Sequence, residues 1–397
     1  MAAYLLVLFI SLTPFLHGFG YFDTYELPKF VWIVALAVIF GLLFCGNISH
    51  LKILRKLKVN TSLLIILLVG VFASVNLLSS YLSGGSSTLS FFGQFYRYNG
   101  ILFYLAITLI FLILRNAHFK DVELNWFIDK VIAYTGIALS AHILLDFVGI
   151  NSSLWKVADY LGRPVGTFGN PNHAGGYLAM ILAFVLSGHE ASKNHVSRII
   201  FSAIIIAGII ATGSLSALLS LCVVFALSVL ISKTKSLPML AIFAGLLLVS
   251  ITLFIFVKNQ NIQNSRPEIW RKSLEAIYKK PILGWGIENI DLAIHSQLGP
   301  NDFYMKEVKI DRSHNIWLDT AIQTGLVGLV LRLVVIGMLI KSLLNKNKLG
   351  YARAALFLLI AFEIFAMFNV IGISQYILLI VLLAFAYNKN LHSASSF

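Results

Sequence analysis

The polar segment DRSHN at residues 311–315 stands directly before a long apolar run. A histidine such as His314 has an unperturbed pKa of about 6.5, so its neutral ring can accept a proton at physiological pH. An arginine such as Arg312 is always charged, and its planar fork matches the oxygens of a phosphate. The segment, which ends at Asn315, therefore indicates proton transfer beside an anionic group.

Two further segments contain polar residues near the start of an apolar run. Arg97 lies among tyrosines in GQFYRYNG, where an aromatic belt with a snorkelling arginine is an equally good interpretation. Arg163 precedes GTFGNPNHAGG, in which Pro171 and Asn172 suit the start of a helix. A helix N-terminus beside an arginine can bind an anion, although an ordinary Gly/Pro turn accounts for this segment better when it is taken alone.

The segment SRPEIWRKSLEAIYKKPILGWG at 265–286 predicts an amphipathic helix outside the membrane. Ser265 and Glu268 have the spacing of a capping box. A helix over this segment has one apolar face, which comprises Ile269, Trp270, Leu274, Ile277 and Tyr278. That face predicts packing on the membrane or on a helical bundle. Arg266 is not needed for such packing and is therefore available for a ligand.

Composition assigns the chain to a broad class. Hydrophobic residues make up 58% of the sequence and charged residues only 12%, and the mean hydropathy is +0.86. Apolar runs long enough to cross a hydrocarbon core of ~30 Å recur along the chain. We therefore expect an all-α polytopic membrane protein with about twelve transmembrane helices. The runs lie near residues 3–20, 28–46, 62–80, 99–115, 127–148, 172–188, 196–212, 214–231, 238–257, 314–341, 353–371 and 373–388.

Basic residues predict the topology. They gather at 47–60, 233–235 and 341–353, which share one side of the membrane if the spans alternate. Because basic loops stay in the cytoplasm, both termini are expected there. This predicts three regions: nine spans over 1–257, a large extracytoplasmic loop with amphipathic helices over 258–313, and three spans with a short tail over 314–397. The first run lacks a basic n-region and a cleavage site, so we expect a retained span rather than a signal peptide.

Several function classes are excluded. The net charge of +13 comes from residues scattered over short loops, so we expect anionic lipid rather than nucleic acid as a partner. The cysteines, Cys45 and Cys222, form neither a disulfide framework nor a zinc site. The sequence contains no Walker loop or dinucleotide fingerprint, and no outer cluster of carboxylates has the spacing of metal ligands. We therefore expect no metal and no other cofactor.

Three segments together resemble the O-antigen ligase and O-antigen polymerase superfamily of bacteria. They are GRPVGTFGNPNHAGGYLAM, SRPEIWRKSLEAIYKKPILGWGIENI and SHNIWLDTAIQTGLVGLVL, in that order. YRYNGILFYL near residue 96 is also similar to an outer-loop pattern of that family. The similarity covers the chain from about residue 91 to 330.

The resemblance implies a bundle of the GT-C type and an inverting, metal-independent glycosyltransferase. Such proteins take a glycan from undecaprenyl diphosphate at the outer face of the cytoplasmic membrane, which faces the periplasm or the cell exterior. Ligases pass the glycan to lipid A–core, polymerases to another lipid-linked repeat unit, and related oligosaccharyltransferases to protein serine. A transporter of the same lipid is the alternative from another class, but transporters usually bind their cargo near the bilayer midplane.

The resemblance also suggests roles for residues. The histidine of the family's His–Asn motif corresponds to His314, and its large-loop arginine corresponds to Arg266. We expect His314 to be the general base and Arg266 to bind the diphosphate as a second catalytic residue. The alternative is that His314 only caps its helix. The candidate substrate-binding residues are Arg163, Arg97, Arg312, Asn172, Asn315 and Trp270. Leu215 stands where many ligases have an arginine, which favours the broader family over the ligases alone.

Overall fold

The computed structural model describes the chain over ten stretches and one isolated residue. These are 2–18, 23, 25–46, 61–119, 121–150, 162–187, 195–231, 266–300, 302–307, 309–346 and 350–388. The long elements are all α-helices. The chain divides into two compact units, and each is described separately below.

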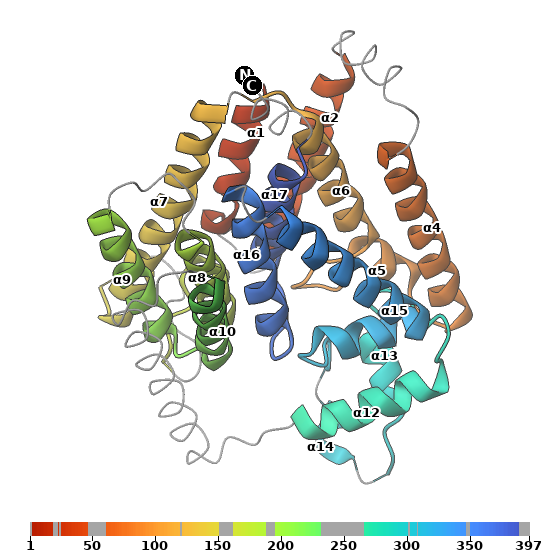
Figure 1. Cartoon of the computed structure of the whole chain (residues 1–397). Coiled ribbons are helices and arrows are strands. Elements are labelled where there is room, and N and C mark those ends of the chain that lie inside the picture. Colours follow the sequence, from red (N-terminus) through yellow and green to blue (C-terminus); the bar gives the residue numbers. More distant parts are fainter. Residues whose placement is uncertain are drawn as a thin grey trace. The chain divides into compact units, whose positions relative to one another are not determined.

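The first unit comprises Met1–Ala2, Phe30–Ile113 and Asn264–Leu339. It contains three of the long apolar helices and the short helices of the large loop (Figure 1). Its elements are most of α2 (Glu26–Gly46), α4 (Thr61–Leu82), α5 (Ser87–Phe92), most of α6 (Ile101–Asn116), α12 (Arg266–Lys279), α13 (Ile290–His295), α14 (Phe303–Glu307) and most of α15 (Ile316–Asn345).

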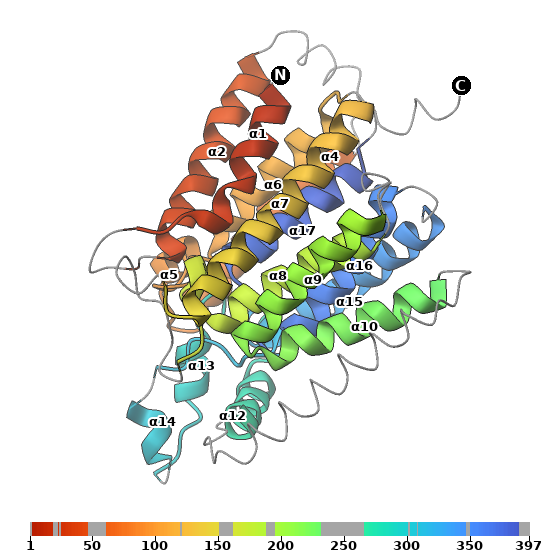
Figure 2. The same ribbon diagram turned by 90° about the vertical axis from the view of Figure 1, so that its left-hand side faces the viewer.

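The second unit comprises Ala3–Lys29, Leu114–Gln263 and Ile340–Phe397. Its helix α8 (Pro171–Leu186) is buried along almost its whole length and packs against α7, α9, α10, α16 and α17, several of which lie beside it in Figure 2. Gly176 allows this packing, because a Cβ atom there would lie 2.5 Å from the ring of Phe365. The other elements are α1 (Ala2–Ser11), η1 (Thr13–Phe15), α7 (Asp121–Phe147), η2 (Gly166–Phe168), α9 (His195–Thr212), α10 (Leu215–Ile231), α16 (Gly350–Ala366) and α17 (Ile373–Ala386).

The helices agree with the membrane class predicted from composition. Four are long and apolar enough to cross a membrane, namely Glu26–Phe44, Leu64–Leu82, Lys130–Phe147 and Ile316–Asn345, and several shorter apolar helices accompany them. A helix coincides with each predicted span except 238–257, which lies outside the described residues. The count of about twelve spans therefore stays a prediction.

The helix predicted at 266–280 forms as α12, but its buried face differs from the expected one. Leu274 and Tyr278 are 58% and 88% exposed. The buried side instead contains Ile269, Lys272 and Ala276. This correction has a physical reason: the large loop has its own apolar core, so α12 packs against α13 rather than presenting its most apolar face inward.

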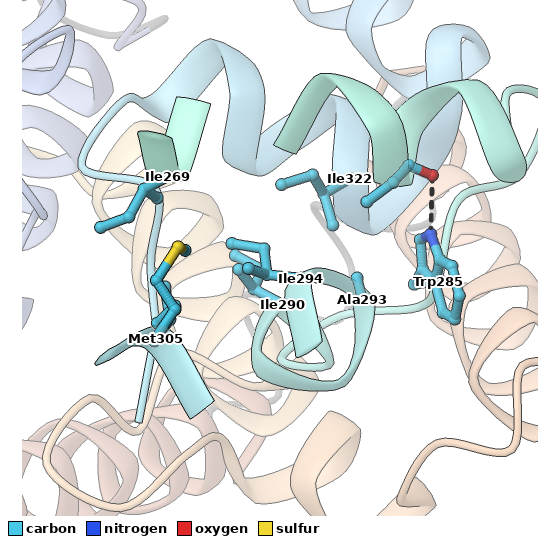
Figure 3. Close-up of a cluster of buried hydrophobic side chains, with 9 residues drawn as sticks. Ile269, Trp285, Ile290, Ala293, Ile294, Met305 and Ile322 are labelled. Atoms are coloured by element: carbon cyan, nitrogen blue, oxygen red, sulfur yellow. Dashed lines mark hydrogen bonds between the residues drawn. The ribbon is translucent and has the colours of Figure 1, made fainter. Parts of the chain in front are cut away.

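That loop core is centred on α12, α13 and the first turns of α15 (Figure 3). Trp285 is 4% exposed, and its indole Nε1 donates a hydrogen bond of 2.9 Å to the carbonyl oxygen of Ala276. Lys272 is tied down by Asp302 at 2.9 Å and by the carbonyl oxygen of Gln297 at 2.6 Å. A charged residue can lie on the buried side because its ammonium group has these partners.

The Pro–x–x–Gly–Trp–Gly motif fills a break in α15. Gly325 has φ +67, which interrupts the helix, and the N–H groups of Trp285 and Gly286 donate to the carbonyl oxygens of Ile322 and Gln323 at 2.8 and 2.9 Å. The N–H of Leu326 donates to the carbonyl oxygen of Pro281 at 2.7 Å. Backbone groups that a continuous helix would pair internally are thus satisfied by the loop.

Candidate functional site

Two ion pairs hold the segment that precedes His314. Arg97 Nε lies 2.5 Å from Asp311 Oδ2, and Arg312 pairs with Glu288. Burial acts to raise the pKa of Asp311, but Arg97 and then Arg312 lower it, and the net direction is downward. Asp311 is therefore a charged anchor for this segment.

The pair of Arg312 and Glu288 belongs to a buried network. Arg312 is 5% exposed and Glu288 is 1% exposed. Glu288 also accepts a hydrogen bond from the N–H of Gln94 at 2.9 Å, and its own N–H donates to Gln323 Oε1 at 2.9 Å. Burial acts to lower the pKa of Arg312, but Glu288 raises it above its ordinary value. Glu288, held by Arg312, thus joins the loop at residue 94, the large loop and α15.

Unusual backbone conformations are concentrated in this network. Among described residues other than glycine, a positive φ is recorded at Tyr96, Tyr98, Glu288 and His314. Each such residue costs about 1–3 kcal/mol, and residues of this kind cluster at functional sites. Tyr96 and Tyr98 flank Arg97. Glu288 forms an ion pair with Arg312, which lies two positions before His314. The strain therefore points to the surroundings of His314.

Asn315, and not His314, caps helix α15. The side-chain Oδ1 of Asn315 accepts hydrogen bonds from the N–H groups of Trp317 and Leu318 at 2.9 and 3.3 Å. Such side-chain acceptors satisfy the free N–H groups at a helix start. The capping role suggested as the alternative for His314 thus belongs to its neighbour.

The imidazole of His314 is left with no hydrogen bond or ion pair to any described part of the chain. Its φ is +59, in the left-handed region. Burial in the first place, and the nearby charge of Arg266 in the second, lower the pKa of His314 to about 4, against the opposing effect of Asp311. The ring is therefore neutral at physiological pH and able to accept a proton.

Arg266 is the first residue of α12, one helical turn before Trp270. Residues four apart lie on one helical face, and the indole of Trp270 donates to the carbonyl oxygen of Ser313 at 2.9 Å, so Arg266 lies on the face of α12 that meets the His314 segment. Within the ranges given above, no ion pair or hydrogen bond is recorded for its guanidinium. Burial lowers the pKa of Arg266 below its ordinary value.

Two of the predicted site residues, Arg163 and Asn172, belong to the second unit. Asn170 caps α8 by accepting from the N–H of Asn172 at 2.8 Å, and Gly169 has φ +66, as the turn before the helix requires. The side chain of Arg163 approaches the turn at Gly213, where a Cβ atom would lie 3.4 Å from its Cδ. The predicted helix start is therefore present, with Arg163 beside the turn that precedes Leu215.

Some residues of the network were not anticipated from the sequence. Glu288 lies two residues after the Gly–Trp–Gly motif, and Asp319 lies in the first turn of an apolar helix. An acidic residue in either place indicates a buried polar contact, because a charge beside or within an apolar segment needs a partner. The identity of that partner depends on the tertiary fold.

Comparison with known proteins adds an independent finding. Residues 200–333 match the family model described as O-Antigen ligase. This segment is therefore similar to an O-antigen ligase domain. It includes Arg266, Trp270, Arg312, His314 and Asn315. No curated protein matches the chain.

The O-antigen ligase domain supports the resemblance to the O-antigen ligase and polymerase superfamily. Members of this family are glycosyltransferase-like enzymes that act on lipid-linked glycans. Together with the apolar helices, the domain indicates an integral membrane protein.

Proposed function

We propose that this protein transfers a glycan from undecaprenyl diphosphate to an acceptor hydroxyl at the outer face of the cytoplasmic membrane. The acceptor is lipid A–core or a similar glycan. The observation that carries the proposal is that Arg266 lies near His314 and that neither side chain has a hydrogen bond or ion pair to the described residues. Both belong to the O-antigen ligase domain.

The reaction requires a base and a stabilised leaving group. The acceptor oxygen forms a bond to the anomeric carbon of the glycan as the bond from that carbon to the diphosphate breaks. The acceptor's proton passes to His314, and the electron pair of the broken bond remains on the undecaprenyl diphosphate. Arg266 binds that diphosphate through its fork. Attack from the side opposite the leaving group makes the transfer inverting.

The low pKa of His314 fits a base that becomes stronger when substrate binds. In the free protein, burial and the charge of Arg266 favour the neutral ring. A bound diphosphate offsets the charge of Arg266 and so raises the pKa of His314. Because a general base works best when its pKa approaches the operating pH, the donor itself would activate the base.

The arginines differ in their freedom to bind a ligand. Arg97 is paired with Asp311, and Arg312 is paired with Glu288. We therefore assign to both arginines the role of holding the segment before His314, with a secondary contribution of positive charge at the site. Arg163, beside the N-terminus of α8 and Asn172, stays a prediction as a diphosphate-binding residue. With arginines in this role, the transfer is proposed to proceed without a metal ion.

A repeat-unit polymerase is the second candidate, because it uses the same donor chemistry. Leu215, the first residue of α10, stands where many ligases have an arginine, and this weakens the ligase assignment relative to the broader family. Transfer to protein serine and transport of the lipid are the remaining alternatives. An assay that offers lipid A–core, a lipid-linked repeat unit and a serine peptide in parallel identifies the acceptor.

The test of the mechanism uses the full-length protein in membrane vesicles with a labelled lipid-linked donor. His314→Ala is expected to nearly abolish transfer, and Arg266→Lys to impair it, because lysine keeps the charge but loses the fork. Expression of each variant is checked by quantitative blotting. Near-normal transfer by His314→Ala refutes the base, and loss of transfer on chelation that magnesium or manganese restores refutes metal independence.

A further inference from the structure

Ser313, the residue directly before His314, is held through its N–H, its hydroxyl and its carbonyl oxygen. The Asp319 Oδ1 atom accepts a hydrogen bond from the Ser313 N–H at 2.8 Å and another from Ser313 Oγ at 2.6 Å. The Trp270 indole donates to the Ser313 carbonyl oxygen at 2.9 Å. Ser313 is completely buried and Asp319 is 7% exposed.

These contacts bear directly on the backbone of His314. The Trp270 bond orients the peptide plane between Ser313 and His314, while the cap formed by Asn315 holds the residue that follows. His314 lies between these two fixed points with φ +59. A non-glycine residue persists in such a conformation only when its surroundings impose it.

We propose that Asp319 is a positioning residue for His314 and that Trp270 acts with it, because together they fix Ser313 from both sides. This inference rests on the proposed function, since it assumes that His314 takes part in transfer. Asp319 acts as a hydrogen-bond acceptor within the protein rather than as a group that touches the glycan. The sequence suggested that Trp270 contacts the substrate. Here we propose instead that its indole positions the backbone of Ser313.

A different role for Asp319 must be separated from this one. An acidic side chain in the first turn of a helix stabilises the positive end of the helix dipole, wherever it points. If that were its only role, replacing Asp319 would lower the stability of the protein without a selective effect on turnover. A measurement of kcat and KM beside the stability of each variant therefore separates the positioning role of Asp319 from a helix-dipole role.

The experiment measures kcat and KM for a labelled lipid-linked donor with the full-length protein. We expect Asp319→Ala to lower kcat by about 10- to 100-fold, as small displacements of catalytic groups do, with KM for the donor unchanged. Asp319→Asn should retain most of the turnover, because its amide oxygen accepts the same bonds. Trp270→Phe keeps the ring but loses the donor, and we expect kcat to fall by up to about tenfold.

Asp291 provides the matched control. Its Oδ1 atom accepts from the N–H of Ile310 at 2.8 Å, so Asp291→Ala removes a carboxylate-to-backbone bond from the same segment without touching Ser313. We expect its kcat to match that of the original protein. An equal fall in kcat for Asp291→Ala and Asp319→Ala overturns the positioning role, as does an Asp319→Asn variant as inactive as Asp319→Ala.

Failure of this inference is distinguishable from failure of the proposed function. If His314→Ala abolishes transfer while Asp319→Ala and Trp270→Phe keep full kcat, only the positioning role is refuted. If His314→Ala transfers normally, the proposed mechanism is refuted as well. Should Asp319→Ala not fold, Trp270→Phe decides the question, because unchanged turnover in that variant contradicts the inference.

Discussion

At the residue scale, the charges around His314 differ in what they contact. Arg312 is buried and paired, whereas Arg266 is half-buried with no partner among the described residues. A buried arginine that is already paired supports a fold, whereas an unpaired one near a neutral histidine can bind an anion. The two arginines should therefore respond differently to mutation.

Replacing Arg312 should damage the fold more than the chemistry. Arg312→Ala leaves the carboxylate of Glu288 buried without its partner, and breaking a buried pair in this way costs about 3–5 kcal/mol of unfolding free energy. Arg266→Ala should instead preserve stability and impair transfer. Thermal unfolding in detergent and the transfer assay, run on both variants, check this. Equal stability of the two variants would contradict it.

The pH dependence of transfer should report His314. A base that must be neutral loses activity as the pH falls through its pKa, so the acid limb of kcat/KM, which reflects the free enzyme, is expected near pH 4. The acid limb of kcat should lie at higher pH, because bound diphosphate offsets the charge of Arg266. Rates measured with saturating and with limiting donor separate the two limbs.

The comparison for this profile is His314→Gln, in which the side chain no longer titrates. Its residual activity should lack both acid limbs. An acid limb of kcat/KM at about pH 6 to 7, which is where an unperturbed histidine titrates, would show that the surroundings of His314 in the working enzyme differ from those described above.

At the scale of elements, the break in α15 joins the large loop to a membrane helix. The two carbonyl oxygens and one N–H freed around Gly325 all bond to residues 281–286. Broken membrane helices are tolerated where other groups satisfy the exposed backbone. The Pro–x–x–Gly–Trp–Gly motif is therefore explained by backbone pairing, and it holds Gln323 where its side chain accepts from the N–H of Glu288.

Gly325→Ala should disrupt this junction. The added Cβ atom would lie 2.0 Å from the carbonyl oxygen of Ile282, and alanine is strained at a φ of +67. Gly337, in the same helix, is the matched control, because no atom of the described chain lies within 4 Å of the place that a Cβ atom there would take. We expect Gly325→Ala to lower both the unfolding temperature and transfer, and Gly337→Ala to leave them unchanged. Equal behaviour of the two variants would contradict the junction.

At the scale of the whole molecule, the apolar helices point to a lipid environment. Only 6% of the residues in the apolar window of Ile316–Asn345 are buried, and only 17% of those in Leu64–Leu82, although both are strongly apolar. Exposed apolar surface of this extent needs a partner, and for helices of this length the hydrocarbon core of a bilayer is the natural one.

The basic loops predict the topology of the chain. Both termini should be cytoplasmic and residues 258–313 extracytoplasmic, because lysine and arginine are retained on the cytoplasmic side. Reporter fusions at each terminus and within 258–313 measure this directly. A loop found in the cytoplasm would separate His314 from a donor at the outer face and would overturn the proposed function.

Much of the architecture could be predicted because helices and membrane spans depend on local composition. A long apolar run predicts its own helix, so the ranges that became α2, α4, α6, α8 and α15 were visible in the sequence. The helix at α12 was also visible, but its buried face was not, because that face depends on which surface the rest of the loop offers.

The sequence by itself determined the class of the protein and the positions of its long apolar helices and of α12. It also placed His314 directly before a membrane helix and Arg266 at the start of α12. Only the tertiary structure decided which charges are paired. Arg97 and Asp311 are 214 residues apart, and Arg312 and Glu288 are 24 apart. Local patterns carry no information about such contacts, because they form only when distant segments pack together. For the same reason, the role of Asp319 beside Ser313 and His314 emerged only from the folded chain.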